Sequence, residues 1–334
     1  MDTYQEAKAV VLSYFDDLEK ASGDGVQQAL LRHHSPAYHF YGVHPFNEVS
    51  SSDAVASAFW QPLKKSFTRV QRRQDVFIAG TSEVANDTWV MSMGHFMGLF
   101  DADWLGIPAN GKLAMLRYAE FNRVEGGKIT HTGMWVDIIG LMQHVGINPL
   151  PPETGHYFIY PGPRSHDGLQ FEAQPELESQ HTLELLNRMI QDLDLLNLSG
   201  DDNCQPEYLA RTWHEDMAWY GPAGIGATYT IERYQRQHQY PFREGLTNKV
   251  YNGHVCRFAE GNYACFFGWP NLSHQPTGGF LGLPGGSPSE MRVVDVYRRE
   301  GEKLSENWVL IDLPHWLLKQ GLDVLERTRS IVNP

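Results

Sequence analysis

The sequence predicts an α+β protein made of two tandem copies of one domain. Three observations support this prediction: the chain has 334 residues, a long segment recurs later in the chain without a gap, and helical patterns precede strand patterns in each copy. A chain of this length exceeds the usual single domain of about 100–200 residues. Helices followed by an antiparallel meander are typical of α+β folds. A strongly curved sheet with helices across one face would enclose a pocket in each copy.

The repeat is clearest at the end of each copy. Residues 117–146, RYAEFNRVEGGKITHTGMWVDIIGLMQHVG, fall on residues 292–321, RVVDVYRREGEKLSENWVLIDLPHWLLKQG, at an offset of 175. A second block, FYGVHPF at 40–46, falls on WYGPAGI at 219–225 at an offset of 179. A period this long indicates a tandem duplication and not a solenoid of small units.

A linker is predicted between the copies. The stretch PLPPETGHYFIYPGPRSHDG, residues 149–168, is rich in Pro and Gly and has no sustained periodicity. This composition is typical of a linker. We therefore predict a first domain over 1–150, a linker over 151–174 and a second domain over 175–334.

Each copy is expected to begin with a helix. Residues 4–20 and 176–198 carry apolar residues at helical spacing, and each run ends before a glycine. Strand-like runs follow in the second half of each copy, and the stretches VEGGK and REGEK separate the last two runs. Glycine accepts a positive φ, so these stretches predict hairpin turns.

Charge and composition exclude several classes of protein. The net charge of -13 and the pI of about 5.6 argue against a surface that follows nucleic acid phosphates. The chain has no run of 18 apolar residues, and its first residues do not resemble a signal peptide, so we expect a cytoplasmic protein without a membrane partner. Cys204, Cys256 and Cys265 lack CxxC spacing, so neither a disulfide framework nor a zinc site is expected.

An aspartate recurs inside an apolar run near the end of each copy, as Asp137 and Asp312. Side chains alternate along a strand, so each aspartate shares a face with earlier residues of its strand. These residues are His131 and Trp135 in the first copy and Glu306 and Trp308 in the second. A carboxylate in apolar surroundings has a raised pKa and can serve as a general acid or base. The alternative is an N-cap, because a short helical segment follows each aspartate.

The preceding strand carries a second pair of candidates in the second copy, Arg292 and Asp295, which match Arg117 and Glu120 in the first. Three residues separate the members of each pair, so only one of them can face the pocket. A one-residue bulge would exchange the two, and the sequence leaves both arrangements open. The member that faces away is expected in an ion pair.

Other pocket candidates are aromatic or histidine side chains. They are Trp60 in the first copy and Trp219, Tyr220 and His238 in the second. Each aromatic residue has an ordinary core position as its alternative. A cluster of histidines between residues 33 and 44 does not match the usual spacing of metal ligands, so no metal site is predicted.

The end of each copy resembles a known family. The pattern R-x-E-G-x-K-[IL], an Asp nine residues after the Lys, and a closing Q-x-V-G or K-Q-G are similar to the C-terminal signature of the SnoaL-like polyketide cyclases. This family lies within the nuclear transport factor 2-like, or cystatin-like, superfamily. The resemblance covers most of residues 4–149 and nearly all of 176–327.

The resemblance implies a cone-shaped, curved sheet wrapped by helices around an apolar cavity. It also implies a ring closure by aldol condensation without cofactor or metal, in which an aspartate at the position of Asp312 and Asp137 acts as acid and base. We expect Tyr220, His238 or Trp308 to donate a hydrogen bond to the developing enolate. Members of the family often pair through their sheets, so the two copies would form such a pair within one chain, and a homodimer is also open.

The resulting function hypothesis is a cofactor-independent cyclase, isomerase or lyase that acts on a small apolar carbonyl compound. The second copy is favoured as the working site because its set of acidic and aromatic residues is fuller. One alternative is a non-catalytic protein that binds a small hydrophobic ligand. Another is a hydrolase that activates water with an Asp and Arg pair, which requires Arg292 and not Asp295 beside Asp312.

Overall fold

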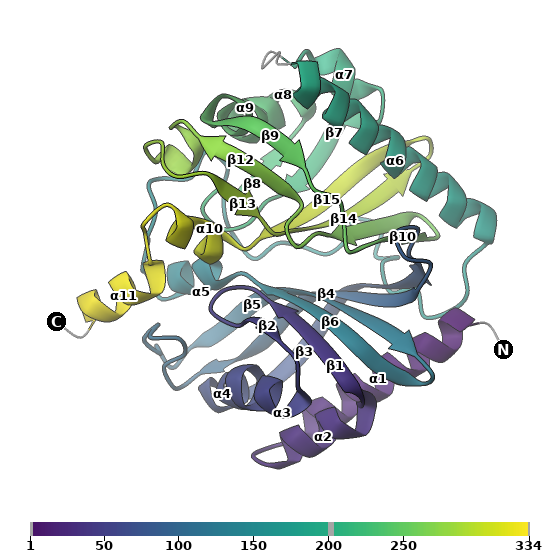
Figure 1. Cartoon of the computed structure of the whole chain (residues 1–334), viewed down its shortest axis with the longest axis vertical. Helices are drawn as coiled ribbons and strands as arrows, with labels where there is room; N and C mark the ends of the chain where they lie inside the picture. Colours follow the sequence, from purple (N-terminus) through teal and green to yellow (C-terminus); the bar gives the residue numbers. More distant parts are fainter. Residues whose placement is uncertain (1–2, 200–203, 333–334) are drawn as a thin grey trace.

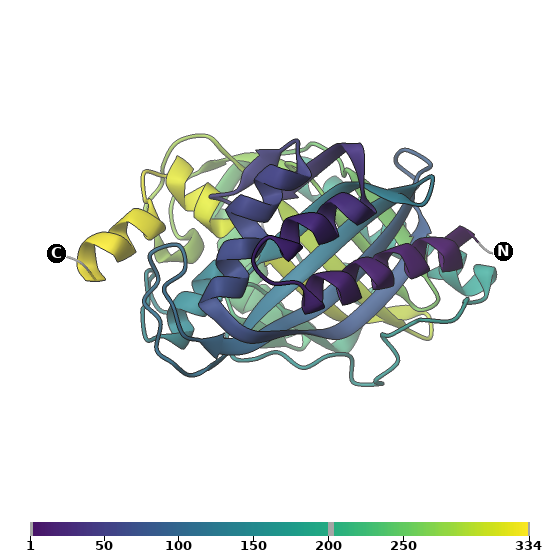
Figure 2. The same ribbon diagram turned by 90° about the horizontal axis from the view of Figure 1, so that it is seen from below.

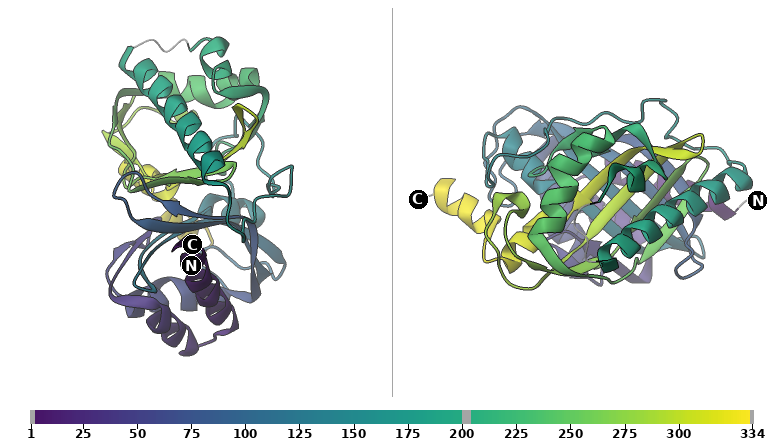
Figure 3. Two further views of the ribbon diagram at one scale, coloured as in Figure 1. Left: turned by 90° about the vertical axis from the view of Figure 1, so that its right-hand side faces the viewer. Right: turned by 90° about the horizontal axis from the view of Figure 1, so that it is seen from above.

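The computed structural model describes residues 3–199 and 204–332 and shows two stacked α+β units (Figure 1). Each unit contains a large curved sheet of six strands, and a small sheet of three strands accompanies the second. The two large sheets lie in the middle of the molecule and most of the helices lie on the outside (Figure 3). The predicted α+β class with two curved sheets is therefore confirmed.

The first unit begins with the predicted helix and has the predicted strands in its second half, but two strands that were not predicted precede its third helix. Its elements are α1 (Thr3–Lys20), α2 (Gly25–His33), β1 (His34–Gly42), β2 (Asn47–Val49), α3 (Ser52–Val55), the π-helical turn η1 (Ala56–Trp60), α4 (Gln61–Ser66), β3 (Phe67–Thr81), β4 (Thr88–Phe100), β5 (Leu113–Glu125), β6 (Lys128–Val136) and α5 (Ile138–His144). Helices α1 and α2 lie across one face of its sheet (Figure 2).

The second unit repeats this order, but the counterparts of β3, β4 and β5 are each divided into two strands and a further helix follows at the end. Its elements are α6 (Glu176–Ser199), α7 (Pro206–Ala210), β7 (Trp213–Tyr220), β8 (Ala227–Tyr229), α8 (Ile231–Tyr234), the π-helical turn η2 (Gln235–Gln239), α9 (Tyr240–Gly245), β9 (Leu246–Tyr251), β10 (Cys256–Glu260), β11 (Tyr263–Phe267), β12 (Leu272–Pro276), the turn η3 (Phe280–Gly282), β13 (Ser289–Met291), β14 (Val293–Glu300), β15 (Lys303–Ile311), α10 (Leu313–Lys319) and α11 (Val324–Val332). None of the helices within residues 3–199 and 204–332 is long and apolar enough to cross a membrane.

The strand order differs from a simple meander at one place in each large sheet. The orders are β2-β1-β6-β5-β4-β3 and β10-β11-β14-β15-β7-β8. The pairs β1 with β6 and β7 with β15 are parallel, and the other neighbours are antiparallel. A fully antiparallel sheet was expected, and the difference arises because the first strand of each copy returns to lie beside the last. The hairpin turns are confirmed, with Gly126 at φ 57° and Gly301 at φ 57°.

An aromatic layer joins the outer faces of the two large sheets. Trp135 of β6 packs against Phe267 of β11 with ring centroids 5.2 Å apart, and its indole N–H donates to the carbonyl oxygen of Arg292 at 3.3 Å. Phe121 of β5 lies 5.0 Å from the same phenylalanine ring. Burying aromatic rings contributes strongly to such interfaces. Side chains on the convex faces of the two sheets therefore form the hydrophobic core between the units.

Residues 145–175 form an extended segment that contains none of the named helices or strands. The segment bonds to both units, since Phe77 N donates to Gly168 O at 2.8 Å and Gly155 N donates to Ile225 O at 2.8 Å. It includes the predicted linker, and the division of the chain at 150 and 174 stays a prediction.

Candidate active site

A cavity of about 240 Å³ lies inside the second unit, between the concave face of its large sheet and the helical segments α6, η2 and α9. Its walls are mainly apolar and aromatic. The lining residues include Leu193, Trp219, Tyr234, His238, Phe242, Tyr251, Asp295, Tyr297, Asn307, Val309 and Ile311. Apolar cavities with a few converging polar groups are the usual sites of small ligands.

Asp295 is one of two carboxylates on the wall of this cavity, and Asp194 is the other. Asp295 lies on β14 opposite Val309 of β15. Its Oδ1 accepts hydrogen bonds from the Tyr297 hydroxyl at 3.0 Å and from the Asn307 amide at 3.2 Å. Its Oδ2 accepts none from the residues that the structure describes. Burial raises the pKa of Asp295 to about 6, and the two hydrogen bonds oppose this shift.

The choice between Arg292 and Asp295 is thereby resolved. Asp295 faces the cavity, whereas Arg292 lies on the other side of the sheet, with its guanidinium 3.9 Å from the ring centre of Trp269. Arg292 Nη1 lies 3.3 Å from Asp312 Oδ2, which is the pair that the hydrolase alternative requires. Asp312 has no exposed surface, however, so a substrate has no access to that pair.

His238 and Trp219 form a second side of the cavity, as expected for both residues. Their rings stack with centroids 4.1 Å apart and an interplanar angle of 16°. Burial lowers the pKa of His238 to about 3, so the imidazole is neutral at pH 7. Its Nδ1 is buried and makes no hydrogen bond with the described residues. A neutral imidazole can present either a donor or an acceptor to a ligand.

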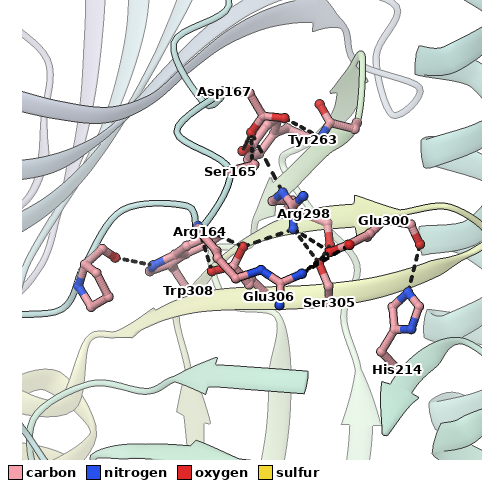
Figure 4. A network of polar contacts seen from close by, with 12 residues as sticks. Arg164, Ser165, Asp167, His214, Tyr263, Arg298, Glu300, Ser305, Glu306 and Trp308 are labelled. Atoms are coloured by element: carbon pink, nitrogen blue, oxygen red, sulfur yellow. Dashed lines mark hydrogen bonds and ion pairs between the residues drawn. The ribbon is translucent and has the colours of Figure 1, made fainter. Parts of the chain in front are cut away.

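The prediction that Glu306, Trp308 and Asp312 line the cavity is wrong. The three residues do share one face, but that face is the outer one. The Trp308 indole N–H donates to Pro161 O at 3.1 Å, and Glu306 accepts from Arg164 N at 3.3 Å (Figure 4). Both faces of β15 are buried, so alternation groups its residues correctly without telling which group faces the helices.

Asp312 and Asp137 cap helices, which was the alternative to a catalytic role. Asp312 Oδ1 accepts from His315 N at 3.2 Å at the start of α10, and Asp137 Oδ1 accepts from Gly140 N at 3.0 Å in α5. Neither aspartate is among the lining residues of the cavity. The geometry therefore gives no support to either as the catalytic acid or base.

The same two aspartates also bond to the opposite unit. Both carboxylate oxygens of Asp312 accept from His44 N at 3.0 Å, and Asp137 Oδ2 accepts from Ala223 N at 2.9 Å. His44 and Ala223 are equivalent positions at the offset of 179. The repeated aspartate therefore forms reciprocal hydrogen bonds between the two copies. Burial raises the pKa of Asp137, and it raises the pKa of Asp312 to about 6.

Replacing Asp312 with Ala is expected to lower the free energy of unfolding by about 2–4 kcal/mol, because the change removes a helix cap and leaves the partly buried His44 N–H without its acceptor. Asp312→Asn keeps the cap and should cost less. Urea denaturation of both variants measures the difference. Equal stability of Asp312→Ala and the unchanged protein would contradict this structural role.

Three other predicted pocket residues also lie outside the cavity. Trp135 belongs to the aromatic layer between the sheets, and His131 lies near Trp89 on the same outer face. Tyr220 lies on the outer face of the second sheet and stacks on Trp308 with centroids 5.5 Å apart. Alternation correctly predicted a shared face for His131 and Trp135, but that face is the outer one.

The interior of the first unit is filled by Arg72. Its Nη1 lies 2.7 Å from Glu120 Oε2, and its guanidinium lies 3.6 Å from the ring centre of Phe15. Trp60, predicted to bind substrate, belongs to the aromatic wall around this arginine. The space left there is about 20 Å³, compared with about 240 Å³ in the second unit.

The two interiors differ at the two positions that form the ion pair between Arg72 and Glu120 in the first copy. Glu120 corresponds to Asp295 at the offset of 175, and Arg72 corresponds to Tyr251 at the offset of 179. The arginine that fills the first interior is therefore a tyrosine in the wall of the second cavity. This exchange is visible in the sequence once the copies are aligned, and it was missed there.

Residues 29–145 match the model of the SnoaL-like polyketide cyclase family. The first copy is a SnoaL-like domain. Among solved structures similar to the chain is a candidate SnoaL-like polyketide cyclase from Jannaschia sp. CCS1, with 18% identity over 46% of this chain and 97% of that one and a TM-score of 0.35. Another is AclR, a candidate hydroxylase from Streptomyces galilaeus, with 21% identity over 45% and 87% and a TM-score of 0.37.

A third structure similar to the chain is an NTF2-like protein from Burkholderia thailandensis E264, with 20% identity over 41% of this chain and 95% of that one and a TM-score of 0.30. A search of the curated proteins found no significant match. Within the SnoaL-like domain the interior is occupied by Arg72, and the open cavity lies in the second copy.

Proposed function

We propose that the second copy is a cofactor-independent acid–base enzyme of the cyclase, isomerase or lyase type. Its substrate is a small apolar carbonyl compound, and Asp295 is its acid and base. The observation that carries this proposal is the position of Asp295 on the wall of a mainly apolar cavity, with one oxygen held by Tyr297 and Asn307 and the other free of hydrogen bonds from the described residues.

The chemistry follows from that position. Asp295 Oδ2 takes a proton from the carbon next to the carbonyl group, and the electron pair of the broken C–H bond moves to the carbonyl oxygen as an enolate. A pKa near 6 suits this transfer, since a general base works best when its pKa is near the operating pH. His238 is the one predicted donor that lines the cavity, and its neutral ring can donate to the enolate oxygen.

Two outcomes complete the reaction. In an isomerisation the protonated Asp295 returns the proton to a different carbon of the enolate. In a ring closure the enolate carbon forms a C–C bond with a second carbonyl carbon of the same molecule, and the resulting alkoxide takes the proton from Asp295. Neither outcome needs an oxidant, a reductant or a second substrate.

The volume of the cavity limits the substrate. A cavity of about 150 Å³ lined by apolar side chains is known to hold benzene. The cavity of about 240 Å³ therefore suits a compound of one or two rings. The bicyclic ketone 2-tetralone has this size and an acidic proton next to its carbonyl group.

Deuterium exchange into 2-tetralone tests the proposal without knowledge of the natural substrate. The purified protein in D₂O is expected to accelerate exchange next to the carbonyl group, as measured by NMR. The rate should rise as the pH increases through about 6 and then level off, because Asp295 acts as a base only when ionised. Binding of the ketone without accelerated exchange would instead favour the non-catalytic binding protein.

A further inference from the structure

A groove of about 590 Å³ lies on the outer face of the second large sheet, on the side opposite to the cavity. Neighbouring residues divide between the two sites: Asn307 faces the cavity and Glu306 the groove, and likewise Trp219 faces the cavity and Tyr220 the groove. The segment 161–166 forms one wall, and β7, β8, β14 and β15 form the rest. The groove is therefore separate from the proposed reaction site.

The two arginines that line the groove already have partners. Arg298 Nη1 lies 3.0 Å from Glu300 Oε2 and 3.3 Å from Glu306 Oε2, and it also donates to Ser305 Oγ at 3.0 Å. Arg164 Nη2 lies 2.9 Å from Glu300 Oε2 (Figure 4). An anionic ligand would have to compete with these carboxylates for both guanidinium groups.

Three carboxylates and two arginines line the groove, and His166 and His214 line it as well. The carboxylates are those of Asp216, Glu300 and Glu306. Within the described part of the chain, Asp216 makes no hydrogen bond or ion pair. The Glu306 side chain is 8% exposed and burial raises its pKa, which means that the surrounding arginines do not fully compensate its charge.

Aromatic rings stand beside these carboxylates. Tyr220 and Tyr229 line the groove together with Asp216 and Glu306. Burial and the nearby negative charge of Glu306 together raise the pKa of the Tyr220 phenol to about 12. Carboxylates next to aromatic rings favour organic cations through charge attraction and cation–π contact.

We propose that this groove binds a small organic cation, a protonated amine carried by an aromatic or apolar body. Asp216, which has no partner among the described residues, binds the ammonium group, and Tyr220 and Tyr229 contact the body. The site belongs to the second copy alone, because the positions equivalent to Asp216 and Glu306 in the first copy hold no carboxylate. They are Ala37 at the offset of 179 and His131 at the offset of 175.

Calorimetric titration with three probes of similar shape tests the charge preference. 2-Phenylethylamine is expected to bind, and its affinity should fall as the salt concentration rises. The neutral 2-phenylethanol and the anionic 3-phenylpropionate should bind at least fivefold more weakly. Equal binding of the alcohol, or tighter binding of the acid, overturns the proposal.

Two variants place the binding in the groove. Asp216→Asn should weaken the binding of 2-phenylethylamine about fivefold, which is the range of a single ion pair at a surface. Glu215→Gln is the matched control, because Glu215 is exposed on the same strand and alternation directs it to the other face. Equal effects of the two variants, or no effect of either, overturn the proposal.

Retained amine binding in Asp295→Asn shows that the groove binds independently of the cavity, and its loss would assign the amine to the cavity.

Discussion

Asp295→Asn is expected to lower the rate of deuterium exchange into 2-tetralone by about 10²–10⁴-fold, the usual contribution of a general base. Asn has the same shape as Asp, and its carbonyl oxygen can still accept hydrogen bonds from Tyr297 and Asn307. The amide nitrogen that replaces Oδ2 cannot accept a proton. The expected loss therefore concerns the chemical step, and binding of the ketone should persist.

The stability of Asp295→Asn shows whether its loss of exchange activity arises from unfolding. The pKa of Asp295 in the folded chain is about 6, above its ordinary value of 3.8, so the folded state binds the proton more tightly than the unfolded state. The contribution of Asp295 to stability is therefore greatest below about pH 4 and declines as the pH rises to about 6. Asp295→Asn lacks this decline and should be no less stable than the unchanged protein at pH 7.

A second carboxylate in the cavity provides the matched control. Asp194 also lines the cavity, from α6. Asp194→Asn changes the charge of the site by the same amount without removing the proposed base, so it should keep most of the exchange activity. Similar losses in the two variants would show that the rate depends on the charge of the cavity and would contradict the role of Asp295.

Arg72→Met is expected to lower the free energy of unfolding by about 3–5 kcal/mol, since removing one partner of a buried ion pair leaves the other charge without compensation. Glu120 has no exposed surface and lies 2.7 Å from Arg72. The substitution also removes the contacts of the guanidinium with Phe15 and Phe96, whose ring centres lie 3.6 and 4.9 Å from it. Urea denaturation measures the loss.

The double variant Arg72→Met with Glu120→Gln should recover part of this stability, because no unpaired charge remains in the interior. Arg73→Met is the control, since Arg73 is the exposed neighbour on β3 and its replacement should change stability by no more than about 0.5 kcal/mol. A loss for Arg72→Met as small as that of Arg73→Met would show that the buried pair does not stabilise the first unit.

Much of the fold could be predicted because its signals are local or periodic. The helices at the start of each copy and the turns around Gly126 and Gly301 follow from spacing within short windows, and the duplication follows from the match between residues 117–146 and 292–321. The parallel pairs β1 with β6 and β7 with β15 join the two ends of each copy. No short-range pattern specifies such a pairing.

The site was predicted less well for a physical reason. Alternation placed Asp312 with Glu306 and Trp308 correctly on one face, yet β15 is buried on both faces, against helices on one side and against the other unit and the linking segment on the other. The sequence left Arg292 and Asp295 as alternatives, and the structure turned Asp295 to the cavity. Arg72 and Glu120 lie on different strands, so no pattern within one strand predicts their ion pair.

The crossed bonds from Asp137 to Ala223 N and from Asp312 to His44 N make each half of the chain depend on the other. A half produced by itself would leave its aspartate without the N–H donor of the other half and would expose Trp135 or Phe267 to water. Such a fragment should self-associate or precipitate. These bonds lie between the halves and not inside them, so they are compatible with two different interiors, one filled by Arg72 and the other an open cavity.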